Sequence, residues 1–403
     1  MKAAPRGGGG INVRRTLRIT GALLLALLAY LAFWPVPIEP VAWEAPTFTG
    51  YAGPHAVNDR LSAVTQVDVS PEVGPEHIDF GPDGKLYTGV LSGAILRMNP
   101  DGSQVEAVVN TGGRPLGFDF TADGQLIVAD AMKGLLAVGP DGSVGVLADR
   151  VDGDPIRYAD AVVIASDGRM YFTDATRRFS PQQLGTFDAS VLDILEHSCT
   201  GRVLVYEPAA ARVALVIGGL CFPNGVALSG DERHLFIAET GEYRIWKVDL
   251  AARGLDARSA LASGDVRARV IASNLPGFPD NLTRSADGRL WTGLTKPRAA
   301  AIDRMASHPW LRAVTLRLPK SLWPVPPTYG HVIAFDEDGR VVADLQDPAG
   351  RLAETSGVTE HGGRLFVHSL HAPAFGVLDT AAAGLPPAGS PEGLEAVQGP
   401  AQQ

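Results

Sequence analysis

The chain has 403 residues, a formal net charge of −9 and 45% hydrophobic residues. All-β barrels and propellers commonly exceed the usual roughly 100–200 residues per domain, so one large β domain is admissible. Binding to nucleic acid requires a basic face, whereas this acidic chain has no long run of Lys or Arg after Arg18. The composition therefore argues against a nucleic-acid partner.

The amino-terminal end has the pattern of a membrane anchor. Arg14, Arg15 and Arg18 precede an uncharged stretch, 19–38, that consists mainly of Leu, Ala and aromatic residues. About 20 such residues suffice for a helix to cross the hydrocarbon core of a bilayer. Basic residues beside a span stay in the cytoplasm. We therefore expect a cytoplasmic segment at 1–18, a transmembrane signal anchor at 19–38, and the rest of the chain on the extracytoplasmic, periplasmic side.

Other interpretations of this stretch remain open. A cleaved signal peptide would share its apolar character, but no clean Ala-x-Ala site follows it. Arg14-Arg15 also loosely resembles a twin-arginine signal. The buried helix of a soluble core is disfavoured, because the stretch lies at the terminus ahead of the proline-rich residues 35–54. The uncleaved anchor is preferred, followed by a linker at 39–62.

A polar turn followed by a short apolar strand occurs six times in the middle of the chain. Asp-Gly between alternating apolar residues is the strongest short-range signal for a β-hairpin. Most copies continue into a second strand pair, so four strands recur at intervals of roughly 40 residues or more. The copies are residues 81–87, 121–127, 165–171, 229–236, 285–291 and 360–366. They predict an all-β, six-bladed β-propeller over 63–385, because a β-sandwich would not repeat the same turn-and-strand motif six times in register.

The segments around the repeats have predicted roles of their own. The strand at 63–69 should complete the last blade and close the ring, since an open edge strand is a liability. The long loops 175–199 and 296–329 should overhang the ligand face. The second loop, in blade five, is predicted to form two short amphipathic helices that pack on the rim, cover a substrate or touch the membrane. The Pro, Gly and Ala-rich end, 386–403, is predicted to be a disordered tail.

Polar residues recur at one position of the inner strands: Glu76, Asp160, Asn224 and Asp280 each stand at the same place before the turn. The inner strands of a propeller begin around one central channel, so these side chains should form a ring. Three carboxylates in a ring repel one another unless a cation binds or one carboxylate stays protonated. Oxygen ligands suit a hard divalent cation, above all Ca²⁺, better than zinc. The alternative is that Asp and Asn cap turns, but caps would be scattered in register.

The motifs beside these positions form a specific combination. Residues 74–78 are Gly-Pro-Glu-His-Ile, 222–229 are Phe-Pro-Asn-Gly-Val-Ala-Leu-Ser, and 277–281 are Gly-Phe-Pro-Asp-Asn. In this combination the chain resembles the strictosidine-synthase-like proteins, including the adipocyte plasma-membrane-associated type, from Val73 to Leu378. That subgroup typically has one amino-terminal membrane span, as expected here.

More distantly, the chain resembles gluconolactonases and paraoxonases. Their calcium site uses a Glu, two Asn and an Asp at the starts of inner strands. The resemblance implies Glu76, Asp160, Asn224 and Asp280 as the ligands here, with Asn281 beside the last. It departs at Asp160, where those relatives have Asn. The extra negative charge should bind the ion more tightly and soften its Lewis acidity.

Two further departures concern catalysis. Strictosidine synthase has a catalytic Glu where this chain has Ser356, which makes condensation of an amine with an aldehyde the least favoured function. Paraoxonases use a His where this chain has Leu116. His77 and His361 lie near the starts of inner strands, and either could act as a base or contact substrate, with Glu360 beside the second.

Two functions fit these features. The first is a membrane-anchored, calcium-dependent hydrolase of lactones or aryl esters, in which the ion polarises the carbonyl and Asp280 acts as general base or nucleophile. The second is a non-catalytic binding module, in which the ion only ties the blades together. A cavity open to solvent would favour the enzyme. A ring sealed by the helical loop 296–329 would favour the binding module.

The two cysteines are predicted to lie on neighbouring strands. Cys199 should begin the third strand of blade three and Cys221 should end the fourth, which places them nearly opposite each other across the turn near 209–211. Outside the cytoplasm they could form a disulfide. Two unpaired buried cysteines are the alternative, because a cross-strand bridge requires closely defined Cβ positions.

Overall fold

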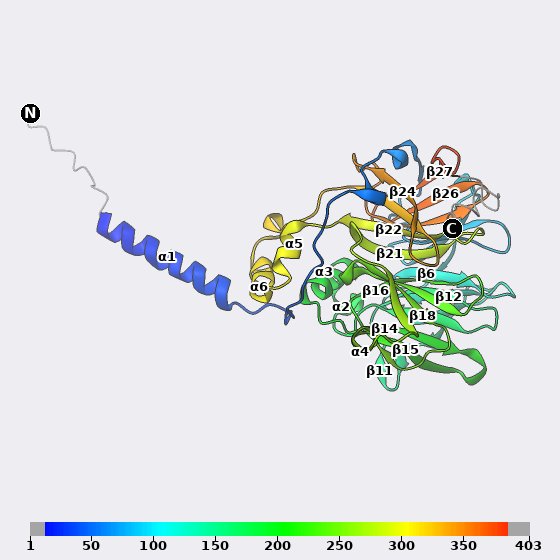
Figure 1. The fold of residues 1–403 in the computed structure, drawn as a ribbon, viewed down its shortest axis with the longest axis horizontal. Coiled ribbons are helices and arrows are strands. Elements are labelled where there is room, and N and C mark those ends of the chain that lie inside the picture. Colours follow the sequence, from blue (N-terminus) through cyan, green and yellow to red (C-terminus); the bar gives the residue numbers. More distant parts are fainter. Residues whose placement is uncertain (1–12, 386–403) are drawn as a thin grey trace, which may run out of the picture.

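The computed structural model describes residues 13–385 (Figure 1). The fold is a six-bladed β-propeller, and in each blade the first strand lies at the central channel and the later strands lie successively farther out. The predicted tail, 386–403, and residues 1–12 lie outside the described range. Blade one contains β2 (Ile78–Phe80), β3 (Leu86–Gly89), β4 (Ala94–Met98) and β5 (Glu106–Asn110). Blade two contains β6 (Pro115–Phe120), β7 (Leu126–Asp130), β8 (Gly134–Val138) and β9 (Val144–Ala148).

The next two blades carry small additions to this pattern. Blade three contains β12 (Ala159–Ile164), β13 (Met170–Asp174), β14 (Gly201–Glu207) and β15 (Arg212–Leu220), and β19 (Leu255–Asp256) joins its outer edge in parallel. The two-stranded ribbon β10 (Arg150–Val151) and β11 (Asp154–Pro155) precedes it. Blade four contains β16 (Pro223–Leu228), β17 (His234–Glu239), β18 (Arg244–Asp249) and β20 (Ala268–Ala272).

The last two blades close the ring. Blade five contains β21 (Gly277–Arg284), β22 (Leu290–Pro297), β23 (Gly330–Phe335) and β24 (Val341–Asp347). Blade six contains β25 (Thr355–His361), β26 (Arg364–Ser369) and β27 (Ala374–Asp379), and its outer strand is β1 (Thr65–Asp68). β1 pairs antiparallel with β27, with Thr65 opposite Val377. The predicted closure is confirmed, and it joins the two ends of the domain without an open seam.

Glycines explain how the blades turn tightly and pack closely. Gly84 and Gly124, in the first two hairpin turns, have φ values of +71° and +85°, which side chains with a Cβ rarely adopt. Gly225, at the start of the inner strand of blade four, leaves no room for a Cβ, which would lie 2.1 Å from the backbone nitrogen of Leu282. The inner strands of blades four and five therefore contact each other directly around the channel.

Helix α1 (Val13–Phe33) stands apart from the propeller (Figure 1). It has 21 residues, none of them buried, and is long and apolar enough to cross a membrane. The span predicted at 19–38 is displaced. The helix already includes Arg14, Arg15 and Arg18, and it ends before Pro35, because a proline disfavours helical backbone in the residue before it.

The segment between α1 and β1 lies against the propeller along its length. The amide of Val41 donates to the carbonyl of Glu196 (2.8 Å), and the amide of Trp43 donates to the carbonyl of Ala306 (3.2 Å). Further on, His55 contacts the carboxylate of Asp344 at 2.7 Å. Two short 3-10 turns, η1 (Gly53–His55) and η2 (Arg60–Ala63), then lead into β1. The segment predicted as a linker is therefore bound to the domain surface.

Short helices occupy the two long loops. The first loop contains α2 (Pro181–Leu184) and α3 (Thr186–Glu196), and the second contains α5 (Ala300–Met305), α6 (Pro309–Arg317) and the turn η5 (Lys320–Leu322). α3, α5 and α6 lie on the side of the propeller that faces α1 (Figure 1). The remaining helical pieces are η3 (Pro208–Ala210), η4 (Thr240–Glu242) and α4 (Ala257–Ser263).

Candidate metal centre

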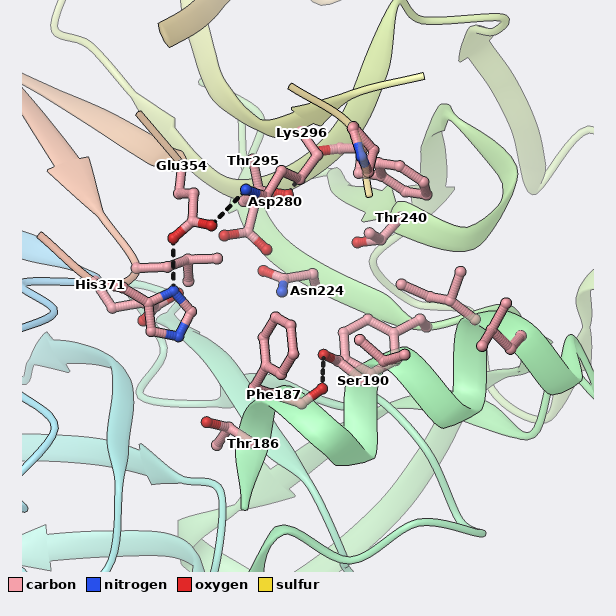
Figure 2. A pocket seen from close by; sticks show the side chains of 18 of the residues that line it. Thr186, Phe187, Ser190, Asn224, Thr240, Asp280, Thr295, Lys296, Glu354 and His371 are labelled. Atoms are coloured by element: carbon pink, nitrogen blue, oxygen red, sulfur yellow. Dashed lines mark hydrogen bonds and ion pairs between the residues drawn. The ribbon is translucent and has the colours of Figure 1, made fainter. Parts of the chain in front are cut away.

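Four polar side chains converge at the central channel. Glu76, Asp160, Asn224 and Asp280 line one cavity of about 240 Å³ and are 1%, 2%, 4% and 5% exposed. They come from blades one, three, four and five, each at the start of an inner strand. Figure 2 shows Asn224 and Asp280 directed into the same space. The structure thus brings together the four residues that the sequence register selected.

A local irregularity of the inner strands directs these side chains. The pairing of the first two strands shifts register between Ala159 and Val162, between Pro223 and Val226, and between Pro279 and Leu282. Each shift brackets one ring residue: Asp160, Asn224 or Asp280. A β-bulge bends the strand and re-aims a side chain. The bulges therefore account for polar side chains that point into the channel rather than between the blades.

The ring presents buried oxygens that lack a partner. Asn224 donates its amide to Oδ2 of Asp160 (3.2 Å), and Asn281 donates to Oε1 of Glu76 (2.9 Å). Five other oxygens have no hydrogen-bond partner among the described residues: Oε2 of Glu76, Oδ1 of Asp160, Oδ1 of Asn224, Oδ2 of Asp280 and Oδ1 of Asn281. A buried acceptor without a donor is costly. A cation in the channel would offset the charge that these oxygens carry, and oxygen donors suit a hard divalent ion.

The electrostatics of the ring also indicate that its carboxylates need a counter-charge. Burial raises the pKa of Glu76 to about 7, partly opposed by Arg114 and the amide of Asn281. Burial, and then the charge of Glu76, raises the pKa of Asp160 and of Asp280 well above the ordinary range. Three carboxylates cannot all ionise in this space without a counter-charge.

Arg114 supplies part of that counter-charge and was not singled out from the sequence. It is 2% exposed and lines the cavity, and its Nη2 donates to the carbonyl of Gly74 (3.1 Å). Its Nε and Nη1 have no partner among the described residues. A divalent ion, if bound, would together with Arg114 balance the three negative charges of Glu76, Asp160 and Asp280.

The cavity wall is apolar, and the two long loops supply much of it. Leu116, Phe222 and Phe278 contribute from the propeller, Phe187 and its neighbours from α3, and residues 323–326 from the second loop. Phe187 is 52% exposed and Val325 is 67% exposed, so the cavity reaches the surface. Both long loops overhang the cavity as predicted, and they leave it open.

The other residues selected from the sequence lie elsewhere. Asn281 adjoins the ring, as described above. His77 is buried behind the ring against Phe118 (centroids 4.9 Å apart), and burial lowers its pKa to about 4. Glu360 contacts Arg289 (3.0 Å) and Trp291 (3.2 Å), away from the cavity.

His361 also lies away from the cavity lining, stacked on Phe80 with a centroid distance of 3.8 Å. It ends β25, whereas the ring end of that strand is at Thr355 and Ser356. A strand rises about 3.3 Å per residue, so the two ends lie far apart. His361 and Glu360 are thus separated from the metal centre by the length of the strand.

A second polar group at the cavity was missed from the sequence. Glu354 contacts Nζ of Lys296 at 2.6 Å and Nδ1 of His371 at 2.7 Å, and all three residues line the cavity (Figure 2). Hydrogen bonds from His371 and Lys296 lower the pKa of Glu354 to about 2. Lys296 lies in β22, whereas Glu354 precedes β25 and His371 follows β26. The three residues share no sequence period, so no pattern groups them.

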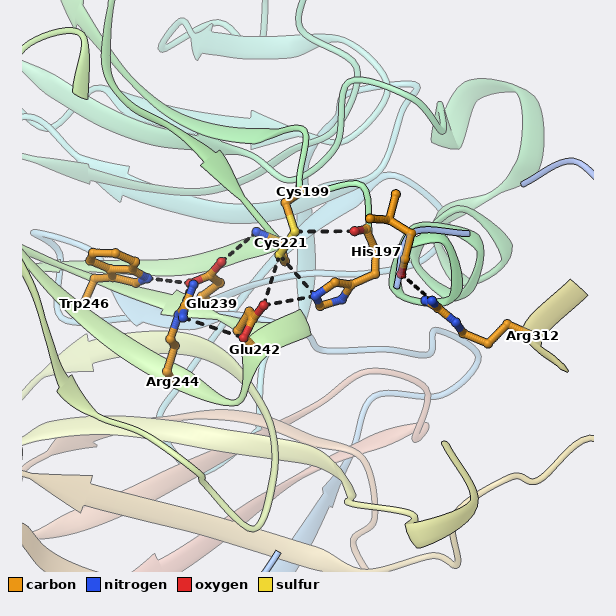
Figure 3. The surroundings of a disulfide bond; sticks show 9 residues. His197, Cys199, Cys221, Glu239, Glu242, Arg244, Trp246 and Arg312 are labelled. Carbon is orange, nitrogen blue, oxygen red and sulfur yellow. Dashed lines mark hydrogen bonds and ion pairs between the residues drawn. A yellow bond between two sulfur atoms is a disulfide. The ribbon is translucent and has the colours of Figure 1, made fainter. Parts of the chain in front are cut away.

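Cys199 and Cys221 form a disulfide in the structure (Figure 3). It links the end of the loop that carries α3 to the start of β16, three residues before Asn224. Nε2 of His197 lies 3.0 Å from Oε1 of Glu242 beside the bridge. The bridge therefore joins the overhanging first loop to the segment that leads into the inner strand of blade four.

Comparison with known proteins places the chain among relatives with this architecture. The family model described as SMP-30/Gluconolactonase/LRE-like region matches residues 81–371, and the model described as Strictosidine synthase-like, N-terminal, matches residues 53–98. The chain is 31% identical over 346 residues to strictosidine synthase-like protein 7 of Arabidopsis thaliana, covering 81% of this chain and 86% of that protein. It is 30% identical over 389 residues to the adipocyte plasma membrane-associated protein of Danio rerio, covering 90% of this chain and 89% of that protein.

Solved structures share the fold at lower identity. A gluconolactonase from Xanthomonas campestris superposes with a TM-score of 0.55 at 19% identity, covering 85% of this chain and 97% of that one. A calcium-binding protein, regucalcin, from Agrobacterium tumefaciens superposes with a TM-score of 0.53 at 15% identity, covering 78% of this chain and 93% of that one. At these identities the similarity shows the fold.

Proposed function

The chain belongs to the SMP-30/gluconolactonase/LRE-like family, in its strictosidine synthase-like branch, and from this premise we propose that it is a calcium-dependent hydrolase of lactones or aryl esters. The observation that carries the proposal is a set of five buried oxygens at a cavity that reaches the surface, none of which has a partner in the described part of the chain. A site meant only to hold blades together has no need of an open, apolar cavity above it.

Glu76, Asp160, Asn224 and Asp280 would hold the ion, with the amide oxygen of Asn281 close by. A bound Ca²⁺ would polarise the carbonyl of the ester and stabilise the negative charge that develops on its oxygen. Asp280 would accept a proton from the attacking water, or attack the carbonyl itself. Arg114 would keep the carboxylates ionised by its fixed charge. Ser356 donates its hydroxyl to the carbonyl of Glu76 (2.7 Å) and supplies no carboxylate, so amine–aldehyde condensation remains disfavoured.

The cavity walls support a substrate with a substantial apolar part. Aromatic and aliphatic side chains dominate the lining, and the polar groups gather at the ring and at Glu354. An uncharged lactone or aryl ester matches this division, because its carbonyl can face the ring while its hydrocarbon part contacts the walls.

The second candidate is a non-catalytic module that uses the ion as a structural link. The observation in its favour is that the ligands come from four different blades, so that one ion would connect them across the channel.

The proposed location is a membrane, with α1 as the span and the propeller on the extracytoplasmic side. The helix length, the basic residues at its amino end and the disulfide support this placement.

The test of function is an activity screen of the purified full-length protein over lactones, aryl esters and phosphotriesters, with and without chelator. We expect hydrolysis of a lactone or aryl ester that chelator abolishes and Ca²⁺ restores. Calcium binding without hydrolysis of any substrate class would leave the structural module as the function.

A further inference from the structure

The structure carries a second group suited to proton transfer, and its role depends on the hydrolase function proposed above. We propose that His371, held by Glu354, donates the proton that the leaving alkoxide of a lactone requires. Asp280 can take the proton of the attacking water, and the departing oxygen also requires a proton, which a second group at the cavity can supply.

The contacts of Glu354 fix the orientation of the imidazole. One carboxylate oxygen lies 2.7 Å from Nδ1 of His371, and the other lies 2.6 Å from Nζ of Lys296. Hydrogen bonds from His371 and Lys296 lower the pKa of Glu354 to about 2, so its carboxylate is ionised at neutral pH. An ionised carboxylate at this distance accepts the proton of Nδ1, and it forms a charge-assisted hydrogen bond when the imidazole is protonated. Nε2 is left free to face a substrate.

The backbone holds the two partners together. Glu354 precedes β25 and His371 follows β26, and the amide of Leu370 donates to the carbonyl of Glu354 (3.1 Å). Phe187 of α3 packs edge-on against the imidazole with a centroid distance of 5.9 Å. The position of His371 is therefore set by two neighbouring strands and by the first overhanging loop.

The imidazole lies at the cavity that contains the ring. His371, Glu76 and Asp280 line the same space, and the charge of His371 contributes to lowering the pKa of Glu76. The His371 side chain is 41% exposed, so a substrate can reach it. The other charged groups that line this cavity are Glu76, Arg114, Asp160, Asp280, Lys296 and Glu354. A lactone with its carbonyl at the ring would lie between Asp280 and His371.

The proton balance of the reaction assigns the two groups different tasks. Water adds to the carbonyl carbon and gives one proton to the carboxylate of Asp280. The bond between that carbon and the ring oxygen then breaks, and the electron pair left on the oxygen takes the Nε2 proton of His371. Asp280 releases its proton to solvent and His371 regains one from solvent, so the net reaction adds one water to the lactone and yields a hydroxy acid.

The basicity of the leaving group provides the test. An alkoxide is a strong base and leaves slowly without a proton, whereas a nitrophenolate is a weak base and leaves without one. The substitution His371→Gln should therefore slow hydrolysis of δ-valerolactone by roughly 10²-fold in kcat, within the usual range for general acid catalysis. Hydrolysis of 4-nitrophenyl acetate by the same variant should change by less than about threefold.

The remaining measurements separate proton donation from a structural role. Glu354→Gln should lower lactone turnover in the same selective way, to a smaller extent. His308→Gln, at an exposed position of the second long loop, is the matched control and should leave the hydrolysis rates of both substrates unchanged. Calorimetry with Ca²⁺ should give the same affinity for His371→Gln as for the wild type. In the proton NMR spectrum, the Nδ1 proton shared with Glu354 should resonate far downfield in the wild type and be lost in Glu354→Gln.

Equal loss of both activities in His371→Gln, or loss of neither, would overturn the donor role while the hydrolase function stands. A wild-type protein that binds Ca²⁺ and hydrolyses neither substrate would overturn the hydrolase function, and the donor role with it.

Discussion

The side-chain amide of Asn224 donates a hydrogen bond to Oδ2 of Asp160, 3.2 Å away. The amide oxygen of Asn224 and Oδ1 of Asp160 have no hydrogen-bond partner among residues 13–385. Asn224→Leu removes both the donor and the ligand oxygen. We expect this variant to lose calcium affinity by at least about tenfold, measured by calorimetry, with the propeller still folded by circular dichroism.

The charge balance of the site predicts opposite effects of two substitutions. Asp160→Asn removes one of three negative charges and should weaken calcium binding by about tenfold. Arg114→Gln removes the neighbouring positive charge and should strengthen it several-fold. The double variant should bind with nearly wild-type affinity, since the net charge of the site is restored. Weaker calcium binding by Arg114→Gln than by the wild type would show that Arg114 does not balance Asp160.

Asp280→Asn should separate binding from chemistry. The amide oxygen can still contact the ion, so affinity should fall only moderately. It cannot accept a proton or attack a carbonyl, so turnover at saturating Ca²⁺ should fall by roughly 10²-fold or more. Glu76→Gln is the comparison, because it should weaken binding and retain turnover once Ca²⁺ is saturating. Equal turnover in Asp280→Asn and the wild type would remove Asp280 from the mechanism.

The raised pKa of Glu76 predicts how stability depends on pH in chelator. Its pKa rises from 4.5 to about 7 in the folded protein, so the folded state favours the protonated carboxyl. This contribution to stability is fully present below about pH 4.5 and is lost as the pH rises through about 7. The melting temperature without Ca²⁺ should therefore fall across this window, and Glu76→Gln should flatten the fall. Added Ca²⁺ should raise the melting temperature most at the alkaline end, because it binds the ionised form.

The anchor predicts a topology that fractionation can test. The full-length protein should sediment with membranes, and protease added from the extracytoplasmic side should digest the propeller. A soluble protein with a new amino terminus between Trp34 and Pro40 would show instead that the segment is a cleaved signal.

The disulfide between the first loop and the segment before β16 predicts a redox dependence. Protein from an oxidising compartment should not react with thiol reagents under denaturing, non-reducing conditions, because Cys199 and Cys221 are bonded. Reduction should loosen the loop that carries α3, which hydrogen exchange at residues 186–196 would report as faster exchange. Full labelling of both cysteines before reduction would contradict the bridge.

The sequence allowed the fold and the ring to be predicted because both follow from one repeated spacing. Each Asp-Gly turn fixes where its hairpin folds, and counting back from it reaches Glu76 and Asp280 in register. Arg114 has no such marker, since a lone arginine in a loop is usually solvated at the surface. Glu354 and His371 meet only through the pairing of β25 with β26. Glu360 was selected beside His361, which was expected near the start of an inner strand, whereas both residues lie at the end of β25 next to its hairpin turn.

The bound segment between α1 and β1 determines how the domain can move relative to a membrane. A flexible segment of the same length would have a root-mean-square end-to-end distance of about 30 Å, and the propeller could then rotate freely relative to the helix. Here Arg317 of α6 donates to the carbonyls of Trp34 and Leu31, and Tyr30 donates to the carbonyl of Arg317, so the end of the helix is fixed to the second loop. With α1 in a bilayer, the propeller has a fixed tilt and its cavity has a fixed height above the lipid.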